Sequence, residues 1–254
     1  MTRLSLLALA AGLALAPPAL AQGTASGTAS AFSPEQRREV VEILREALRQ
    51  DPSILREALT ALQQAETEDR AKAQRSAIVA QSEALFRGAE DPVKGNPQGA
   101  VTIVEFFDAR CGYCKQMEPA MEQMLRRQKD VRLVLKDLPI LGPNSLLASR
   151  ALLAAQRQGK YAELHEALLR LREEPAEPVL KREAEKLGLD WARLRRDMDD
   201  PTIARRLEAN TRLAGALRIE GTPALVIGDT LVPGAVDLAT LERLVSEART
   251  KQGG

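Results

Sequence analysis

Apolar residues recur at intervals of three and four positions through residues 32–86. This spacing places them along one side of an α-helix. The run Ser33-Pro34-Glu35-Gln36 has the pattern of a capping box with proline at the first helical position, which predicts a helix start. Asp51-Pro52 interrupts the spacing, so we expect two helices, at residues 33–50 and 52–86. The stripe consists of Val41, Leu44, Leu48, Leu55, Ala58, Leu62 and Ala65.

This stripe is narrow and the rest of the segment is charged, so its apolar side chains need a covering surface. The sequence is compatible with two covering surfaces: the domain that follows in the same chain, or the same segment of other subunits. We therefore interpret residues 32–88 as a helical segment for oligomerisation or docking. Residues 89–99 carry Gly and Pro at close intervals and are expected to be a linker.

Residues 100–250 have the pattern of an α/β domain. Residues 101–107 and 131–135 are short apolar runs typical of buried strands, and residues 111–128 between them have helical spacing. Strand, helix and strand in this order predict a β-α-β unit. A helical insertion at about residues 144–218 follows, and then a hairpin and a last helix. We expect insertion helices at 145–158, 161–172, 178–187, 191–198 and 201–217, hairpin strands at 224–227 and 230–232, and the last helix at 238–248.

Residues 1–21 have the pattern of a secretory signal peptide. A basic start at Arg3 precedes an uncharged stretch from Leu4 to Ala16, a proline break and a small-residue cleavage pattern at Ala19-Leu20-Ala21. We expect cleavage after this pattern, followed by a small, polar and disordered leader at residues 22–31. The mature protein is then expected in the periplasm.

Composition narrows the class of protein further. With 254 residues, of which 44% are hydrophobic and 28% charged, the chain can bury a core, and no apolar run reaches the roughly 18 residues of a membrane-spanning helix. Removal of Arg3 with the signal peptide leaves Lys and Arg equal in number to Asp and Glu. A neutral chain has no bulk attraction for nucleic acid, so no nucleic-acid partner is expected.

The two cysteines of the chain, Cys111 and Cys114, lie at the predicted turn from a strand into a helix. A bridge between them closes almost no loop, so the pair indicates chemistry rather than structural stabilisation. At a helix start, unpaired N–H groups and the helix dipole favour the thiolate of Cys111, and Cys114 one turn later can resolve a mixed disulfide. A structural zinc site would need four ligands, whereas the chain adds only one histidine, His165. Neither His165 nor Trp191 is assigned a role.

Several ordered motifs carry a family resemblance. The chain resembles the secreted DsbA-like thiol-disulfide oxidoreductases with a thioredoxin fold, over about residues 97–250. The Cys-Gly-Tyr-Cys form and the helical N-terminal extension are most similar to the suppressor-of-copper-sensitivity C and Com1-like proteins, although the leader lacks a lipobox cysteine. The motifs are Phe106 to Lys115, Lys136 to Ser145, Gly159-Lys160-Tyr161 and Gly221-Thr222-Pro223-Ala224.

The resemblance implies an α/β thioredoxin fold with a helical insertion, preceded by the N-terminal helical segment. It implies that Pro223 is a cis-proline facing the cysteines, and that the exposed backbone of Thr222 can pair with an extended substrate. Gly112 and Tyr113 form the spacer of the motif, whose surroundings set the redox potential. No cofactor is expected, and the partners implied are secreted proteins with thiols or disulfides and a membrane protein that resets the cysteines.

Glu105 is a carboxylate within an apolar strand, six residues before Cys111. From the residues alone it is either a solvent-facing strand end or a buried and paired charge. The family places an acid at this position and a base on the next strand, which here matches Lys136. The resemblance therefore implies that Glu105 and Lys136 together move the proton of Cys114 during exchange.

These observations predict a thiol:disulfide oxidoreductase with catalytic Cys111 and Cys114, leaning to an isomerase or reductase in a homo-oligomer joined through residues 32–88. Isomerisation favours several sites around a shared cleft, and a break at Asp51-Pro52 would permit relative movement. A monomeric dithiol oxidase is the main alternative. Two other classes stay open: a periplasmic protein that binds Cu(I) through the two thiolates, and a helical assembly module whose thioredoxin-like domain is only a scaffold.

Overall fold

The computed structural model describes residues 32–252, in two compact units divided between Leu62 and Gln63. We call residues 32–62 the N-terminal unit and residues 63–252 the C-terminal unit, and each is described by itself. The predicted signal peptide and leader, at residues 1–31, lie outside the described residues. No helix among the described residues is both long and apolar enough to cross a membrane.

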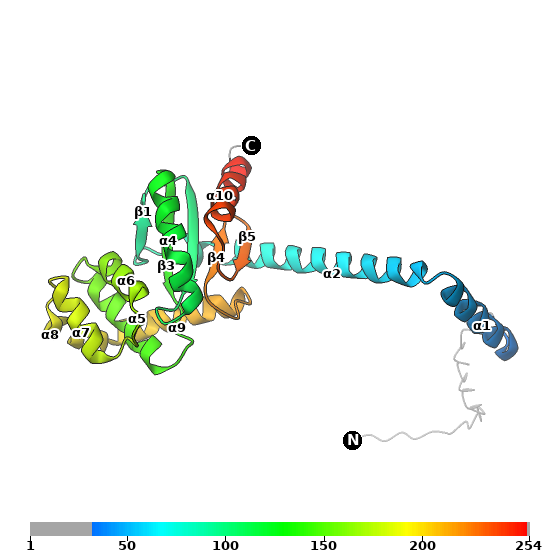
Figure 1. The fold of residues 1–254 in the computed structure, drawn as a ribbon, viewed down its shortest axis with the longest axis horizontal. Helices are drawn as coiled ribbons and strands as arrows, with labels where there is room; N and C mark the ends of the chain where they lie inside the picture. The colour runs from blue at the N-terminus through cyan, green and yellow to red at the C-terminus, as the bar shows by residue number, and fades with distance from the viewer. Residues whose placement is uncertain (1–31, 253–254) are drawn as a thin grey trace, which may run out of the picture. The chain divides into compact units, whose positions relative to one another are not determined.

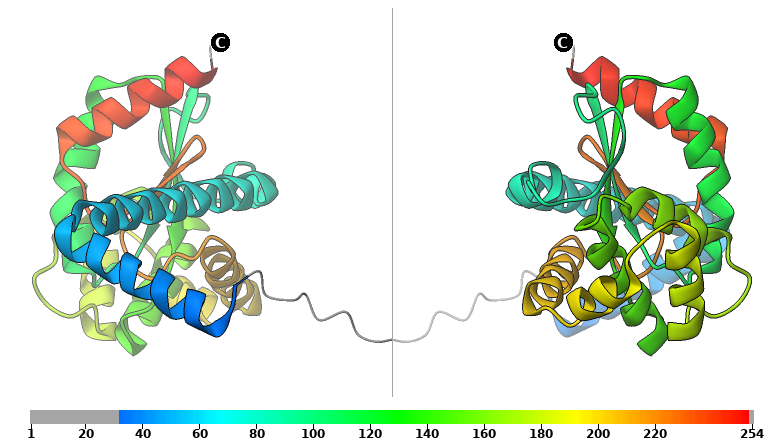
Figure 2. Two further views of the ribbon diagram at one scale, coloured as in Figure 1. Left: turned by 90° about the vertical axis from the view of Figure 1, so that its right-hand side faces the viewer. Right: turned by 90° about the vertical axis from the view of Figure 1, so that its left-hand side faces the viewer.

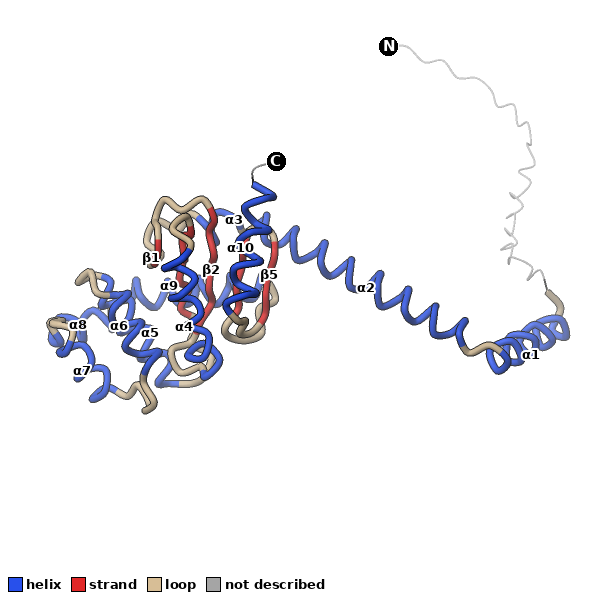
Figure 3. Tube along the Cα trace, turned by 45° about the horizontal axis from the view of Figure 1, so that its top comes forward, coloured by secondary structure: helices blue, strands red, loops and turns tan. Residues whose placement is uncertain are grey.

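The N-terminal unit contains helix α1 (Pro34–Gln50) and the start of helix α2 (Ser53–Ala80) (Figure 3). The predicted capping box is confirmed: the Gln36 N–H donates to Ser33 Oγ at 3.2 Å, and the Ser33 N–H donates to Gln36 Oε1 at 2.8 Å. The predicted break is also present, because Asp51 ends α1 and its carboxylate accepts the N–H of Ser53 at 3.0 Å. No side chain of α1 is buried, so its apolar stripe faces solvent.

The C-terminal unit is built on a five-stranded mixed sheet of order β1-β3-β2-β4-β5 (Figure 1). Strands β2 and β3 are parallel and are connected by one helix, as the predicted β-α-β unit requires. The hairpin strand β4 pairs antiparallel with β2, and β5 pairs antiparallel with β4. This is the predicted thioredoxin-like fold. The strands are β1 (Val93–Gly95), β2 (Val101–Phe107), β3 (Val131–Asp137), β4 (Ala224–Ile227) and β5 (Thr230–Pro233).

Helices cover both faces of this sheet, since its central strands are apolar on both sides. On one face α4 (Gly112–Arg127) packs beside α10 (Leu238–Gln252) (Figure 2). On the other face, Ile78 near the end of α2, Leu85 of α3 (Ser82–Phe86) and the end of α9 (Pro201–Ala216) share a second apolar cluster with β2 and β4.

The predicted helical insertion lies between β3 and β4. Its helices are α5 (Pro143–Gln156), α6 (Tyr161–Arg170), α7 (Glu177–Lys186), α8 (Trp191–Met198) and α9. Their apolar sides join the core on the α4 face of the sheet. His165 is fully buried, in edge-on contact with the ring of Phe107 at a centroid distance of 4.6 Å, and Trp191 packs at the border of the same core.

Three expectations for residues 52–99 need correction. The helix expected at 52–86 is divided at Gln81 into α2 and α3. The expected linker 89–99 contains β1, which pairs antiparallel with β3, a short edge strand that the Gly and Pro pattern conceals. The boundary expected at residues 88–89 also moves, because Ile78 and Leu85 are core residues of the C-terminal unit.

Candidate active site

Cys111 lies at the turn from β2 into α4, at the N-cap position of the helix. Its side chain makes no capping hydrogen bond; instead, the Sγ–H donates to the backbone carbonyl of Thr222 at 3.1 Å. The peptide bond between Thr222 and Pro223 is cis, as the family resemblance implied. The loop before β4 therefore brings a peptide carbonyl into direct contact with the first thiol of the motif.

Cys114 lies within the first turns of α4 and is fully buried. Burial raises the pKa of the Cys114 thiol well above its usual value, and the negative charge of Glu105 raises it further. Between the cysteines, Gly112 has open space where a Cβ would lie, and the Tyr113 side chain is 66% exposed. Both thiols are thus buried, with 6% of Cys111 exposed and none of Cys114, while Tyr113 of the spacer faces solvent.

Glu105 is buried in β2, so its interpretation as a solvent-facing strand end is wrong. Burial raises its pKa to about 8, the nearby charge of Glu118 adds to this shift, and Lys94 opposes it. Its Oε2 has no hydrogen-bond partner among the described residues. A carboxylate with an unused oxygen and a raised pKa beside Cys114 is suited to exchange a proton with that thiol.

Lys136 does not pair with Glu105, which corrects the expected proton-transfer pair. In the register of β2 and β3, Glu105 lies opposite Leu135, and Lys136 lies opposite Phe106. Because side chains alternate between the faces of a sheet, Lys136 and Glu105 point to opposite faces. The Lys136 ammonium instead donates to Asp91 Oδ2 at 2.5 Å and to the carbonyl of Ala84 at 2.8 Å.

The basic group near Glu105 is Lys94 of β1, the strand within the expected linker. Its ammonium donates to Glu118 Oε1 at 2.7 Å, and both side chains are nearly buried. Burial raises the pKa of Glu118, and the charge of Lys94 opposes this. Glu118 could have been found from sequence, since it follows Cys114 by four positions and so shares its face of the helix. No comparable signal marks Lys94.

Asp108 and Arg110 fasten the turn that carries Cys111 and were also missed. The fully buried Asp108 carboxylate accepts the N–H groups of Arg110 at 2.8 Å, Ile140 at 2.9 Å and Leu141 at 3.0 Å. The Arg110 guanidinium donates to the Leu141 carbonyl and to Glu174. Two loops distant in sequence are thereby fixed to the cysteine turn.

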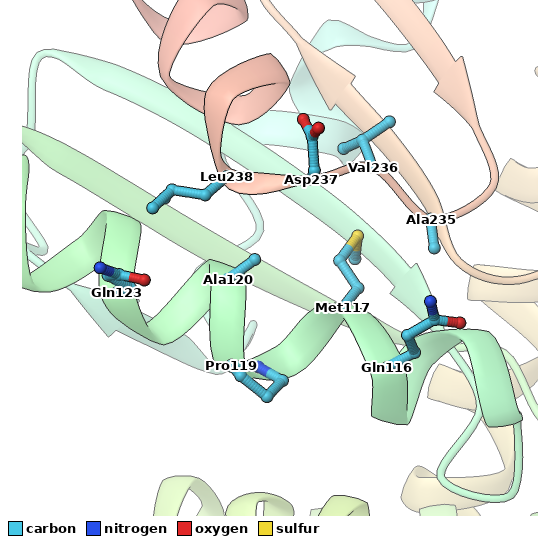
Figure 4. A pocket seen from close by; sticks show the side chains of 9 residues that line it. All are labelled: Gln116, Met117, Pro119, Ala120, Gln123, Ala235, Val236, Asp237 and Leu238. Atoms are coloured by element: carbon cyan, nitrogen blue, oxygen red, sulfur yellow. The ribbon is translucent and has the colours of Figure 1, made fainter.

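Two hollows lie beside α4, and one of them adjoins the cysteine turn. One, of about 380 Å³, lies between α4 and the loop that leads from β5 into α10 (Figure 4). The other, of about 450 Å³, lies on the side of Arg110 and Lys115, where the Lys115 ammonium donates to the Leu171 carbonyl at 2.9 Å. The first hollow is lined by Gln116, Met117, Pro119, Ala120, Gln123, Ala235, Val236, Asp237 and Leu238.

No group of three or more His, Cys, Asp or Glu side chains that could hold a metal ion occurs within residues 32–252. The donor set at the site is therefore the pair of thiols, both without a disulfide in this structure. The arrangement offers a thiol at the helix start, a second thiol that can resolve a mixed disulfide, a buried acid and a peptide carbonyl. These groups suffice for thiol-disulfide exchange with a polypeptide.

Comparisons with known proteins agree with this geometry. Residues 102–246 match the family model of the DSBA-like thioredoxin domain, and residues 36–68 match that of the copper resistance protein ScsC N-terminal domain. A solved thioredoxin-like oxidoreductase from Silicibacter pomeroyi is 40% identical, with a TM-score of 0.65, over 66% of this chain and 97% of that one. Proteus mirabilis ScsC in a transitional conformation is 32% identical, with a TM-score of 0.65, over 87% of this chain and 98% of that one.

The similarity extends to part of a larger protein. The Na(+)/H(+) antiporter NhaA 3 of Salinispora tropica is 33% identical over 160 residues, which make up 62% of this chain and 24% of that protein. The chain spans about a quarter of the length of the curated relatives of this kind.

Proposed function

Because the chain belongs to the DSBA-like thioredoxin domain family, we propose that it is a thiol:disulfide oxidoreductase that acts on cysteines of proteins in the periplasm. The observation that carries this proposal is the contact of Cys111 Sγ with the Thr222 carbonyl beside cis-Pro223, with Cys114 buried directly behind. A solved periplasmic thioredoxin-like protein of Salmonella enterica, 34% identical over 66% of this chain, supports the location.

In the proposed cycle, the Cys111 thiolate attacks one sulfur of a substrate disulfide. A Cys111–substrate disulfide forms, and the other substrate sulfur leaves as a thiolate. Cys114 then gives its proton to Glu105 and attacks Cys111 Sγ, so that the Cys111–Cys114 disulfide forms and the substrate cysteine is released. The substrate gains two electrons, and the cysteine pair loses them. The reverse sequence oxidises a substrate dithiol.

Glu105 is the residue of this chain that we assign to the proton of Cys114. It must be ionised to accept the proton, and its raised pKa of about 8 makes it a stronger base than an ordinary carboxylate. Lys94 and Glu118 support it as a buried ion pair, whereas Lys136 takes no part. Gly112 and the exposed Tyr113 form the spacer beside Cys111, and the Thr222 backbone is the pairing partner for the substrate strand.

Variants of the two cysteines test the proposal. Cys111→Ser should abolish reduction of a protein disulfide, whereas Cys114→Ala should accumulate substrates as covalent adducts that a reductant releases. Both are measured by mass spectrometry under non-reducing conditions. Equal activity of Cys111→Ser and the unaltered protein would exclude the proposed nucleophile and leave the scaffold hypothesis.

We further propose that the N-terminal unit joins copies of the chain and that the assembly favours disulfide isomerisation. The support is the exposure of large apolar side chains along one side of α1 and the start of α2, within the segment that matches the ScsC N-terminal domain. Such a stripe is stable in water when another apolar surface covers it. The side chains are Val40, Val41, Ile43, Leu44, Leu48, Ile54, Leu55, Leu59 and Leu62.

Paired substitutions in the full chain test the assembly. Leu44→Ser with Leu48→Ser should lower the mass found by light scattering and reduce the refolding of a scrambled disulfide substrate. Glu42→Ser with Glu46→Ser, on the opposite side of α1, is the matched control and should change neither. A monomeric unaltered protein, or a stripe variant that unscrambles equally well, would favour the monomeric dithiol oxidase.

A truncated protein gives a second test of the assembly, provided that the truncation leaves the core of the C-terminal unit intact. Removing residues through 88 would take away Ile78 and Leu85, which are buried in the C-terminal unit, and the Ala84 carbonyl that Lys136 binds. Loss of activity would then report unfolding. A truncation that begins at Gln63 keeps this packing and should oxidise dithiols without isomerising.

Cu(I) binding is a second candidate. Two adjacent thiols suit a soft ion that accepts low coordination, and the matched N-terminal family model is named for a copper resistance protein. Titration of the reduced protein against a Cu(I) chelator tests this directly. Competition that Cys111→Ser and Cys114→Ala each remove would support the site, and no competition by the unaltered protein would exclude it.

A further inference from the structure

The hollow of about 450 Å³ beside the cysteine turn has no part in the proposed cycle. Its lining comes from the turn and the start of α4, with Arg110, Gly112 and Lys115, and from the loop between α6 and α7 at residues 171–175. Arg110 and Gly112 flank Cys111 in the chain. None of the lining residues belongs to the loop before β4. The hollow is therefore formed apart from the carbonyl that we propose as the partner of a substrate strand.

The loop between α6 and α7 is fixed to the cysteine turn by two of its residues. The Lys115 ammonium donates to the Leu171 carbonyl at 2.9 Å. The Glu174 carboxylate pairs with the Arg110 guanidinium and accepts a hydrogen bond from the Asn144 amide at 3.3 Å. These contacts hold the walls of the hollow without a ligand, so a ligand would lose little free energy in ordering them.

The hollow has an excess of positive charge that its own side chains do not neutralise. Its two carboxylates, Glu173 and Glu174, are each paired with an arginine. Lys115 and Arg172 also line the hollow, and within residues 32–252 neither of them forms a salt bridge. Two cations therefore remain for a ligand, and they favour a ligand that carries carboxylates.

Lys115 connects this positive charge with the chemical state of Cys111. Burial lowers the pKa of the Lys115 ammonium, whereas the charges of Glu174 and of the Cys111 thiolate raise it. The thiolate loses its charge when Cys111 enters a mixed disulfide, so Lys115 then loses an anionic neighbour. A carboxylate on the group attached to Cys111 can take the place of that neighbour.

We infer that this hollow binds the carboxylates of a small acidic disulfide while one of its sulfurs is joined to Cys111. The inference rests on the proposed function. The Cys111 thiolate attacks one sulfur, a Cys111–ligand disulfide forms, and the other half of the ligand leaves as a thiolate. Cys114 then gives its proton to Glu105 and attacks Cys111 Sγ, which releases the attached half as a second thiolate. Two electrons pass from the cysteine pair to the ligand.

Two symmetric disulfides test the inference: glutathione disulfide, which carries carboxylates, and hydroxyethyl disulfide, which is uncharged. The rate constant for oxidation of Cys111 in the reduced full-length protein is measured with each, by acid quenching and mass spectrometry. The ratio of the two rate constants cancels any change in the reactivity of the thiolate itself. Lys115→Gln with Arg172→Gln should lower this ratio at least about fivefold, and Arg172→Gln alone by a smaller factor. Added salt should also lower it in the unaltered protein.

Arg126→Gln with Lys129→Gln is the matched control. Both side chains are exposed, at and just past the other end of α4, and their replacement removes the same charge from the protein. This variant should keep the ratio. An equal loss in the control would overturn the inference, because it would show an effect of net charge and not of the hollow.

A ratio that Lys115→Gln with Arg172→Gln leaves unchanged would also overturn the inference. Two peptides, with either Glu or Gln beside a cysteine in a disulfide with a neutral small thiol, distinguish the source of the carboxylate. If the double variant affects this pair and not glutathione disulfide, the hollow binds acidic polypeptide and the inference is wrong. Hydroxyethyl disulfide is the separate check on the proposed function: if neither small disulfide oxidises Cys111, the exchange chemistry itself fails, and the inference with it.

Discussion

The N-terminal unit exposes apolar side chains, whereas the C-terminal unit buries charged ones. Leu44 and Leu55 are more than half exposed on α1 and α2, while Glu105, Glu118 and Lys136 lie inside a packed domain. Each arrangement is costly in isolation, because water disfavours apolar surface and a protein interior disfavours charge. For the exposed stripe we propose a partner outside the chain. The buried charges are explained by partners within it and, at Glu105, by chemistry.

The buried pair of Lys136 and Asp91 gives the strongest test of this contrast. Asp91→Ala leaves an ammonium inside the domain without its carboxylate, so we expect a loss of about 3 to 5 kcal/mol in the free energy of unfolding in urea. Asp130→Ala, which breaks the half-exposed pair with Arg249, should cost less than about 1 kcal/mol. If Lys136 takes no part in exchange, the pH dependence of Cys114 attack should not change in folded Asp91→Ala.

Stability should fall as the pH rises, because buried carboxyl groups favour their protonated form. Burial raises the pKa of Glu105 to about 8 and that of Asp137 to about 7. The contribution of Glu105 is fully present below its ordinary pKa and is lost as the pH rises towards 8, by up to about 1.4 kcal/mol per pH unit, or roughly 3 kcal/mol between pH 5.5 and 8.5. Urea unfolding measures this.

Glu105→Gln is the variant that separates the two carboxyl groups. It should reduce the slope of stability against pH and retain the part due to Asp137, whose carboxylate accepts the Tyr161 hydroxyl at 2.7 Å. Glu163→Gln on the surface of α6 should leave the slope unchanged. A slope that is the same in Glu105→Gln and in the unaltered protein would contradict the raised pKa.

Asp108→Ala should destabilise the C-terminal unit by about 3 kcal/mol, since it leaves three N–H groups without their acceptor in a partly buried turn. Thermal unfolding and urea titration measure the loss. Asp237→Ala removes an exposed acceptor of the Thr240 N–H and should cost about 1 kcal/mol. Equal losses in the two variants would mean that the Asp108 contacts are no stronger than an exposed helix cap.

Ser33→Ala should have the smallest effect, about 1 kcal/mol, and only within α1. Amide hydrogen exchange of the first turn of α1 detects it as faster exchange. Thr60→Ala on α2, where the hydroxyl donates to the Arg56 carbonyl, should change exchange little. Protection that is unchanged in Ser33→Ala would indicate that contacts between copies, and not the cap, hold the start of the helix.

Much of the fold follows from the sequence because its signals are local. The capping box at Ser33, the break at Asp51, the apolar run of β2 and the hairpin turn before Thr230 each act over a few residues. The break at Gln81 and the edge strand β1 depend instead on packing against the sheet, which no local pattern reports. The cysteine turn could be predicted from sequence because it is also marked by a local signal, an apolar strand followed directly by the cysteine motif at a helix start.

The errors at the site concern which groups face each other across strands. Assigning Lys136 as the partner of Glu105 requires the register of β2 and β3, and that register places their side chains on opposite faces. Lys94 could not be chosen without β1, and Asp108 gains its role only from the loop that follows β3. The residue types in the sequence thus identified the thiol chemistry. The residues that surround the cysteines and Glu105, such as Lys94 and Asp108, could be found only from tertiary contacts.

The hydrogen bond between Cys111 and Thr222 also bears on the occupancy of the site by peptides that cannot react. At rest, the thiol donates to the Thr222 carbonyl, which we propose as a partner for the substrate strand. A peptide without a cysteine must displace this bond and gains little in exchange. Once Cys111 is joined to a substrate sulfur it has no hydrogen to donate, and the carbonyl becomes free for the strand attached to that sulfur. The substrate strand is therefore held only after its disulfide with Cys111 has formed. Peptides without a cysteine, even at high concentration, should inhibit the site only weakly.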